Sequence, residues 1–134
     1  MRKERLEAAA KYYAAYNAGS VDAVIDCYSD DATHEEVAFA KTRCGREALR
    51  EGVERFLALF ADLEFELRRT VVSGDSIMCD YRMTGTVTKD LGPMKLAGES
   101  IVLSGSHLLE FDGIRISKCR DYWDPEELAS QAVG

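Results

Sequence analysis

Long hydrophobic runs are missing from this chain of 134 residues. No apolar run approaches the roughly 20 residues that a membrane-spanning helix requires. The opening stretch, MRKERLEAAAKYYAAY, is charged and helical in pattern, and it lacks the apolar centre of a secretory signal. We therefore expect a soluble, cytoplasmic protein that has no membrane partner.

Clusters of basic residues are missing as well. The chain has 17 Lys and Arg residues against 24 Asp and Glu residues, which gives a net charge of −7. A protein that binds nucleic acid through its phosphates needs a basic surface. The charge balance therefore argues against nucleic acid as the main partner, and by itself it selects no substrate.

Cysteine spacings typical of metal or redox sites are also absent. The four cysteines, Cys27, Cys44, Cys79 and Cys119, form no CxxC pair and have no zinc-type spacing. We expect reduced and mostly buried thiols. The chain also lacks a glycine-rich phosphate loop and a nucleophile elbow. Nothing in it therefore indicates nucleotide binding or nucleophilic catalysis by serine or cysteine.

Helical periodicity is present in the first half of the chain. Apolar residues at helical spacing predict a helix over residues 3–17, which Gly19 ends. Ser20 is placed to cap a short helix over 21–28. The turn-like segment SDDAT leads into an extended stretch over 33–39, and a third helix is expected over 46–60.

Strand periodicity dominates the second half. Apolar and charged residues alternate from residue 63 to a turn at 73–75, and further strands are expected over 77–88, 100–111 and 115–123. The last two strands would form a hairpin around Asp112 and Gly113, and the tail would begin with a short helical turn. This order predicts a single α+β domain over 1–134, whose helices cover one face of a curved antiparallel sheet and leave a conical pocket.

Four stretches together resemble the SnoaL-like branch of the NTF2-like superfamily. They are YYAAYNAGSVDAVIDCYSDDAT, GREALREGVERFLALFADLEFEL, DYRMTGT and HLLEFDGIRISKCRDYWDPEEL. The resemblance implies a cone of three N-terminal helices on a strongly bent antiparallel sheet, and a homodimer formed through the sheet face. The superfamily includes ketosteroid isomerases, polyketide cyclases, epoxide hydrolases and non-catalytic binding modules, so the function has to be argued from the site.

A carboxylate, Asp121, stands near the end of the last predicted strand, in the segment RDYWD. It faces either water, where it would pair with Arg120 or another base, or the pocket. It falls where SnoaL-like polyketide cyclases carry their acid/base aspartate, so the resemblance implies a pocket position. In a dry pocket its pKa would be raised and it would exchange protons near neutral pH.

The face that His107 occupies depends on the hairpin turn. A two-residue turn at Asp112 and Gly113 sets His107 on the face opposite Asp121. A three-residue turn that includes Ile114 pairs His107 with Cys119 and brings Asp121 onto the same face. The resemblance favours the second register and implies that His107 donates a hydrogen bond to a substrate oxygen.

Two further candidate catalytic residues come from the resemblance to ketosteroid isomerases. Glu36 falls where those enzymes have their base, and Tyr12 falls where they have an oxyanion-hole tyrosine. Glutamate is one methylene longer than aspartate, so this position departs from the pattern of those enzymes. Tyr12 and Tyr16 could equally be lining residues, because helix tyrosines are more often packed than catalytic.

Two other activities are not favoured. Limonene epoxide hydrolases need an Arg and an Asp two residues apart on the strand 77–88, where this chain has Tyr81 and Met83. Asp80 and Arg82 are one position away and would point to the other face. The sequence HEE at 34–36 offers only two metal ligands on one strand face, so no metal site is predicted.

The remaining pocket residues are expected to be apolar or aromatic, and they imply a small hydrophobic ligand that carries a few oxygens. They are Tyr16, Phe39, Phe56, Phe60, Tyr81, Met83, Cys119 and Trp123. One hypothesis is a cofactor-independent acid/base enzyme of the isomerase, cyclase or hydratase type. The alternative is a non-catalytic binding or dimerisation module. Polar groups that converge within roughly 3 Å of one point would favour the enzyme.

Overall fold

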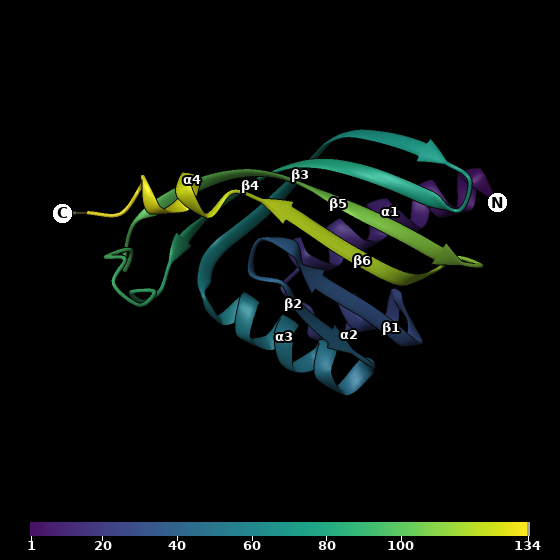
Figure 1. The fold of residues 1–134 in the computed structure, drawn as a ribbon, viewed down its shortest axis with the longest axis horizontal. Helices are drawn as coiled ribbons and strands as arrows, with labels where there is room; N and C mark the ends of the chain where they lie inside the picture. The colour runs from purple at the N-terminus through teal and green to yellow at the C-terminus, as the bar shows by residue number, and fades with distance from the viewer. Residues whose placement is uncertain (134) are drawn as a thin grey trace.

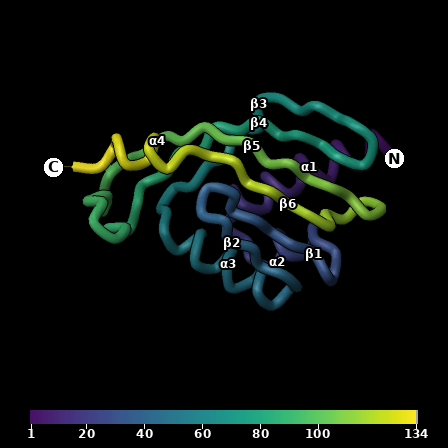
Figure 2. The backbone as a smooth tube through the Cα atoms, in the orientation of Figure 1, coloured from purple at the N-terminus to yellow at the C-terminus, as the bar shows by residue number. Residues whose placement is uncertain are grey.

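The computed structural model describes residues 1–133, and three of its helices cover one face of a curved sheet (Figure 1). The elements in chain order are α1 (Arg2–Asn17), α2 (Val21–Asp26), β1 (Tyr28–Glu36), the 3-10 helix η1 (Val37–Phe39), β2 (Lys41–Cys44), α3 (Arg46–Ala58), β3 (Phe60–Ser73), β4 (Ser76–Val87), β5 (Ser100–Asp112), β6 (Arg115–Trp123) and α4 (Pro125–Ala129). The backbone trace in Figure 2 shows the two termini at opposite ends of the long axis.

The first two helices form where the sequence predicts them. In α1 the buried residues repeat at helical spacing, so one face of the helix packs on the sheet; they are Ala9, Tyr12, Tyr13, Ala15 and Tyr16. Gly19 adopts a positive φ of 66° and ends the segment. The Ser20 hydroxyl then accepts a hydrogen bond of 3.1 Å from the Ala23 amide and caps α2. The Gly19 turn and the Ser20 cap therefore set where α1 ends and where α2 begins.

The sheet has six strands in the order β2-β1-β6-β5-β4-β3. All neighbours are antiparallel except β1 and β6, which are parallel. The expected purely antiparallel sheet is therefore wrong, and a fourth helix, α4, follows the last strand. The sheet is curved but does not close. Its ordering places β1 and β2, from the first half of the chain, beside the C-terminal strand.

Strand β1 begins earlier than the sequence pattern predicts. Tyr28 was expected in a helix, but it is buried in the strand, and the turn-like Asp30 and Asp31 are exposed strand residues. The pairing with β6 is irregular between Tyr28 and Thr33, which accommodates the two polar residues. Similarly, α3 ends at Ala58 and Phe60 opens β3, so the helix is two residues shorter than expected.

The β5–β6 hairpin has neither of the two expected registers. Asp112 pairs with Arg115, so Gly113, at φ 62°, and Ile114 form the turn. The register then shifts beyond Phe111, and His107 lies directly opposite Asp121. The two side chains share a face, as the favoured hypothesis required, but the cause is a bulge rather than a three-residue turn.

No helix within residues 1–133 is long and apolar enough to cross a bilayer.

Candidate active site

A cavity of about 230 Å³ lies between α3, β1, β2 and the inner face of the sheet. The lining residues combine apolar, acidic and basic side chains. They are Tyr16, Tyr28, His34, Glu36, Lys41, Arg43, Leu49, Gly52, Val53, Arg55, Phe56, Leu59, Phe65, His107 and Asp121. The predicted pocket therefore exists, and it contains three of the four candidate catalytic residues.

The polar floor of the cavity follows the registers of the sheet. Glu36 on β1 pairs with Lys41 on β2 and with Asp121 on β6, and Asp121 pairs with His107 on β5. Paired residues on neighbouring strands point to the same face. The register alone therefore places a lysine, two carboxylates and an imidazole in one row across four strands.

A second row lies two residues along the strands from the first. In it, His34 on β1 pairs with Arg43 on β2 and with Cys119 on β6. Because side chains alternate with a period of two, both rows face the cavity side of the sheet. His34 therefore lies beside Glu36 and near Asp121, although the sequence analysis gave it no catalytic role.

Asp121 is held by two donors that reach the same oxygen. The Tyr81 hydroxyl donates to Oδ1 at 2.8 Å, and His107 Nε2 lies 3.4 Å from that oxygen. Among residues 1–133 no hydrogen bond reaches Oδ2. The Asp121 side chain is 13 % exposed and lines the cavity, so one carboxylate oxygen is fixed and the other is free.

Both ring nitrogens of His107 have partners within the protein. Its side chain is only 3 % exposed, and a hydrogen bond of 2.6 Å joins its Nδ1 to the Tyr13 hydroxyl. Both ring nitrogens are therefore used inside the protein, one by Tyr13 and one by Asp121. This arrangement orients the carboxylate. It leaves His107 no free nitrogen for the expected hydrogen bond to a substrate oxygen.

The pKa of Asp121 moves opposite to the expected direction. Burial alone would raise the pKa, but the charge and hydrogen bond of His107, with smaller contributions from His34 and Tyr81, hold it below its ordinary value. Burial likewise disfavours the charged form of His107, yet the Asp121 carboxylate raises the pKa of this histidine. The two side chains form a buried ion pair, and Asp121 is ionised at neutral pH.

A second histidine–carboxylate pair lies alongside the first. His34 Nε2 is 2.9 Å from Glu36 Oε1, and Trp123 Nε1 donates to Glu36 Oε2 at 3.0 Å. A hydrogen bond of 3.3 Å joins the other His34 nitrogen to the Tyr28 hydroxyl. Burial lowers the pKa of His34, but Cys119 and Glu36 together raise it well above its ordinary value. The raised pKa favours the protonated form of His34, which lies next to the Glu36 carboxylate.

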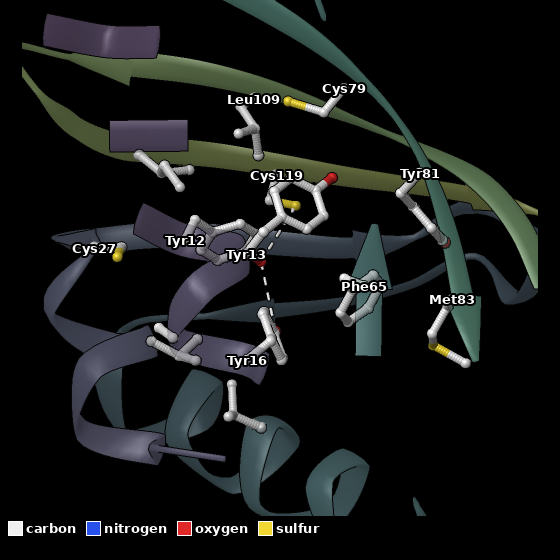
Figure 3. Packing of buried hydrophobic residues seen from close by; sticks show 14 of the residues in the cluster. Tyr12, Tyr13, Tyr16, Cys27, Phe65, Cys79, Tyr81, Met83, Leu109 and Cys119 are labelled. Atoms are coloured by element: carbon white, nitrogen blue, oxygen red, sulfur yellow. Dashed lines mark hydrogen bonds between the residues drawn. The ribbon is translucent and has the colours of Figure 1, made fainter. Parts of the chain in front are cut away.

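Tyr12 lies behind this second pair and does not line the cavity. It is fully buried, and its hydroxyl is 2.5 Å from the Tyr28 hydroxyl and 3.5 Å from that of Tyr16. It also donates to the Cys119 sulfur at 3.8 Å, and Figure 3 shows these tyrosines of α1 facing Cys119. Burial raises the pKa of Tyr12 far above its ordinary value, so it stays protonated and supports Tyr28.

Gly105 on β5 gives Tyr81 its path to Asp121. Tyr81 belongs to β4 and Asp121 to β6, so the tyrosine has to reach across β5. Tyr81 pairs with Gly105, and a Cβ at that position would overlap the Tyr81 hydroxyl and lie 2.5 Å from its Cζ. The absence of a side chain at Gly105 is therefore what allows the hydrogen bond.

The expected pocket walls divide into two groups. Tyr16 and Phe56 line the cavity, whereas the others pack around it or lie at the surface; these are Phe39, Phe60, Tyr81, Met83, Cys119 and Trp123. Phe39 is 59 % exposed and contacts Trp123 edge to face. The lining residues that the sequence analysis missed come mainly from α3 and β2 and include Leu49, Val53, Leu59, Lys41 and Arg43.

The epoxide-hydrolase pattern is absent, as the sequence indicates. Tyr81 and Met83 are buried on the inner face of β4, whereas Asp80 is exposed on the outer face.

One oxygen or nitrogen atom from each of His34, Glu36 and Asp121 lies within 4.8 Å of the others, which is the donor set that could hold a cation. His34 already pairs with Glu36 there, so a cation would have to displace its proton.

The ion pair between His107 and Asp121 predicts a window of pH in which it stabilises the fold. The raised pKa of His107 contributes stability below its ordinary value of 6.5, and this is lost as the pH rises through the folded-state pKa. The lowered pKa of Asp121 contributes above its ordinary value of 3.8, and this is lost as the pH falls through the folded-state pKa. The contribution is therefore greatest from about pH 4 to 6.5.

Thermal denaturation of the wild type and His107→Gln between pH 5 and 9 measures this contribution. The gap in melting temperature is expected to narrow as the pH rises above 6.5. His34→Gln, measured in parallel, separates the effect of the second histidine. A gap that stays constant across the range would mean that folding does not shift the pKa of His107.

Comparison with known proteins agrees with this fold. The family model described as the SnoaL-like domain matches residues 9–119. A candidate polyketide cyclase from Xanthomonas campestris pv. campestris is 21 % identical, with 97 % of each chain covered and a TM-score of 0.83.

Two further solved structures share the fold at low identity. A candidate SnoaL-like polyketide cyclase from Jannaschia sp. CCS1 is 13 % identical, with 97 % of this chain and 92 % of that chain covered and a TM-score of 0.84. A protein with a ketosteroid isomerase-like fold from Catenulispora acidiphila, in complex with trimethylamine, is 19 % identical, with 94 % and 92 % covered and a TM-score of 0.82. The NTF2-like architecture is thereby confirmed, and the match over 9–119 shows that this chain belongs to the SnoaL-like domain family.

Proposed function

We propose that this protein is a cofactor-independent acid/base enzyme that acts on a small hydrophobic carbonyl compound. The observation that carries the proposal is the free Oδ2 of Asp121, which belongs to an ionised carboxylate, lines the cavity and lies near the cation His34. A base beside a bound molecule, with a positive charge close to the oxygen that becomes negative, is what proton transfer next to a carbonyl requires.

The proposed step starts with a carbonyl compound in the cavity. Asp121 Oδ2 takes a proton from the carbon next to the carbonyl, and the C–H electron pair becomes the double bond of an enolate. The carbonyl π electrons move to oxygen, and the nearby positive charge of protonated His34 stabilises the enolate. Return of the proton from Asp121 to another carbon gives an isomer. Attack of the enolate carbon on a second carbonyl of the same molecule instead closes a ring, and the alkoxide that forms takes the proton back from Asp121. Only protons and carbon bonds change, so the chemistry calls for no redox group.

The lowered pKa of Asp121 restricts the substrate. A carboxylate that is fully ionised at neutral pH is a weak base, so the C–H bond must be made acidic by its surroundings. Ketosteroid isomerase shows that an aspartate with a nearly ordinary pKa suffices when the enolate oxygen is well stabilised. We therefore expect a carbon flanked by two carbonyls, or by one carbonyl and an aromatic ring. Several structural neighbours are described as polyketide cyclases, which is consistent with such substrates.

Deuterium incorporation into 2-tetralone tests the proposal. This compact bicyclic ketone has acidic protons between its carbonyl and its ring, and their exchange in D₂O is followed by NMR. The wild type is expected to accelerate exchange above the buffer rate. His34→Gln is expected to slow it about tenfold, because a neutral amide replaces the positive charge beside the enolate. Binding of the ketone without any acceleration would instead favour the non-catalytic binding module.

A further inference from the structure

The cavity is basic although the protein is acidic. Its lining contains three Lys and Arg residues and two Asp and Glu residues, while the whole chain has 17 and 24. The lining also contains two histidines whose pKa values are raised. Arg55 pairs with Glu51, and each histidine pairs with a carboxylate. Among the described residues the positive charge left without a partner in the cavity lies on Lys41 and Arg43, which favours an anion there.

The basic residues gather at the open end of the cavity. Among the lining residues, the exposed fraction of the side chain is 3 % for His107, 32 % for Glu36 and 68 % for Arg55. His107 therefore lies at the closed end of the cavity and Arg55 at the open end. Lys41 is exposed and Arg43 is half-buried, and both lie on the edge strand β2. Strand spacing sets the Lys41 backbone about 10 Å from that of Asp121, since one strand lies between them.

Gly52, in the middle of α3, leaves the space that the Arg43 side chain occupies. A Cβ at Gly52 would lie 2.7 Å from Arg43 Cδ and 2.8 Å from its Nε, so the arginine crosses the helix where there is no side chain. A glycine inside a helix normally destabilises it, so the position needs a local reason. The Arg43 guanidinium donates only a long bond of 3.4 Å to the Ala48 carbonyl, and within residues 1–133 it has no carboxylate at ion-pair distance.

From this arrangement we propose that the ligand is an amphipathic acid whose carboxylate binds Arg43, with Lys41 beside it. Arginine matches a carboxylate with two parallel hydrogen bonds. The apolar body of the ligand would then lie against Leu49, Val53 and Phe56, and its carbonyl end would reach Asp121. The inference rests on the proposed function for the position of the reacting end, but the acid recognition is tested by binding alone.

The test compares 2-naphthoate with its neutral analogue 2-naphthamide, titrated into the protein and followed by NMR. The wild type is expected to bind 2-naphthoate at least tenfold more tightly. Arg43→Gln is expected to remove this preference and to leave 2-naphthamide binding unchanged. Arg50→Gln is the matched control, because Arg50 on α3 pairs with Asp22 at 2.7 Å and does not line the cavity.

Gly52→Ala provides a second, independent variant. Alanine favours the helix, so the fold is expected to survive, but the methyl group would displace Arg43 and weaken 2-naphthoate binding as Arg43→Gln does. Equal binding of acid and amide to the wild type would overturn the inference. Exchange of 2-tetralone without a preference for the acid would overturn only the inference, whereas the preference without exchange would overturn only the proposed function.

Discussion

Replacing Asp121 with asparagine is expected to slow the deuterium exchange of 2-tetralone by about 100- to 10,000-fold, the usual contribution of a positioned general base. Asparagine has the same shape, and its side-chain oxygen can still accept from Tyr81 and His107. Its amide group replaces the free Oδ2 and cannot take a proton. The variant therefore removes the base while it preserves the contacts that orient it.

A second measurement on the same variant tests the electrostatic argument. The Asp121 carboxylate raises the pKa of His107, so the pKa of this histidine is expected to fall in Asp121→Asn when it is followed by NMR titration. Asp80→Asn is the control, because Asp80 is exposed on the outer face of β4, where its carboxylate accepts a hydrogen bond from Ser106. Exchange at the wild-type rate in Asp121→Asn would assign the base to another residue, with Glu36 as the next candidate.

The sequence predicts the elements that local patterns determine. Gly19 and Ser20 mark the end of α1 and the start of α2, and the helix over 3–17 is found at Arg2–Asn17. The segment RDYWD, with the stretches around it, indicates the family and predicts that Asp121 is a pocket residue. These signals are local because a cap, a turn or a strand alternation is set by residues within a few positions.

Long-range contacts determine what the sequence could not show. The start of β1 at Tyr28 depends on a parallel partner, β6, that is almost ninety residues away in the chain. His107 and Asp121 lie on the same face of the sheet because of a bulge in their hairpin, and a register error of one residue would put them on opposite faces. The lowered pKa of Asp121 depends on His107 and Tyr81, which come from two other strands.

The α1 tyrosines show how finely the site depends on helix rotation. Successive helix residues point about 100° apart, so Tyr12 and Tyr13 face different neighbours. The resemblance assigned the functional position to Tyr12, yet Tyr13 is the residue that bonds His107, and Tyr12 supports Tyr28 instead. Periodicity predicts that both are buried, but the docking angle of α1 on the sheet decides which hydroxyl reaches which partner.

Gly105→Ala is expected to lower both stability and activity, although it adds only one methyl group. The new Cβ would overlap the Tyr81 hydroxyl and lie 2.7 Å from the Tyr122 carbonyl oxygen, so neither the side chain nor the backbone can stay in place. Overpacking of this kind costs about 1–3 kcal/mol, which lowers the melting temperature by roughly 4–10 °C. Loss of the Tyr81 bond would free the Asp121 carboxylate and slow 2-tetralone exchange roughly 10- to 100-fold.

Tyr81→Phe separates the two effects, because it removes the hydroxyl without adding a methyl group. It is expected to slow exchange much as Gly105→Ala does, while the melting temperature falls less. Tyr81→Leu in the Gly105→Ala background should restore part of the stability but not the activity, since the clash is removed and the bond is not. Gly85→Ala, whose Cβ would lie 3.3 Å from a Phe60 ring carbon, is a milder control on the neighbouring strand. If Gly105→Ala melts and reacts like the wild type, Tyr81 does not position the carboxylate, and the orientation of Asp121 rests on His107 alone.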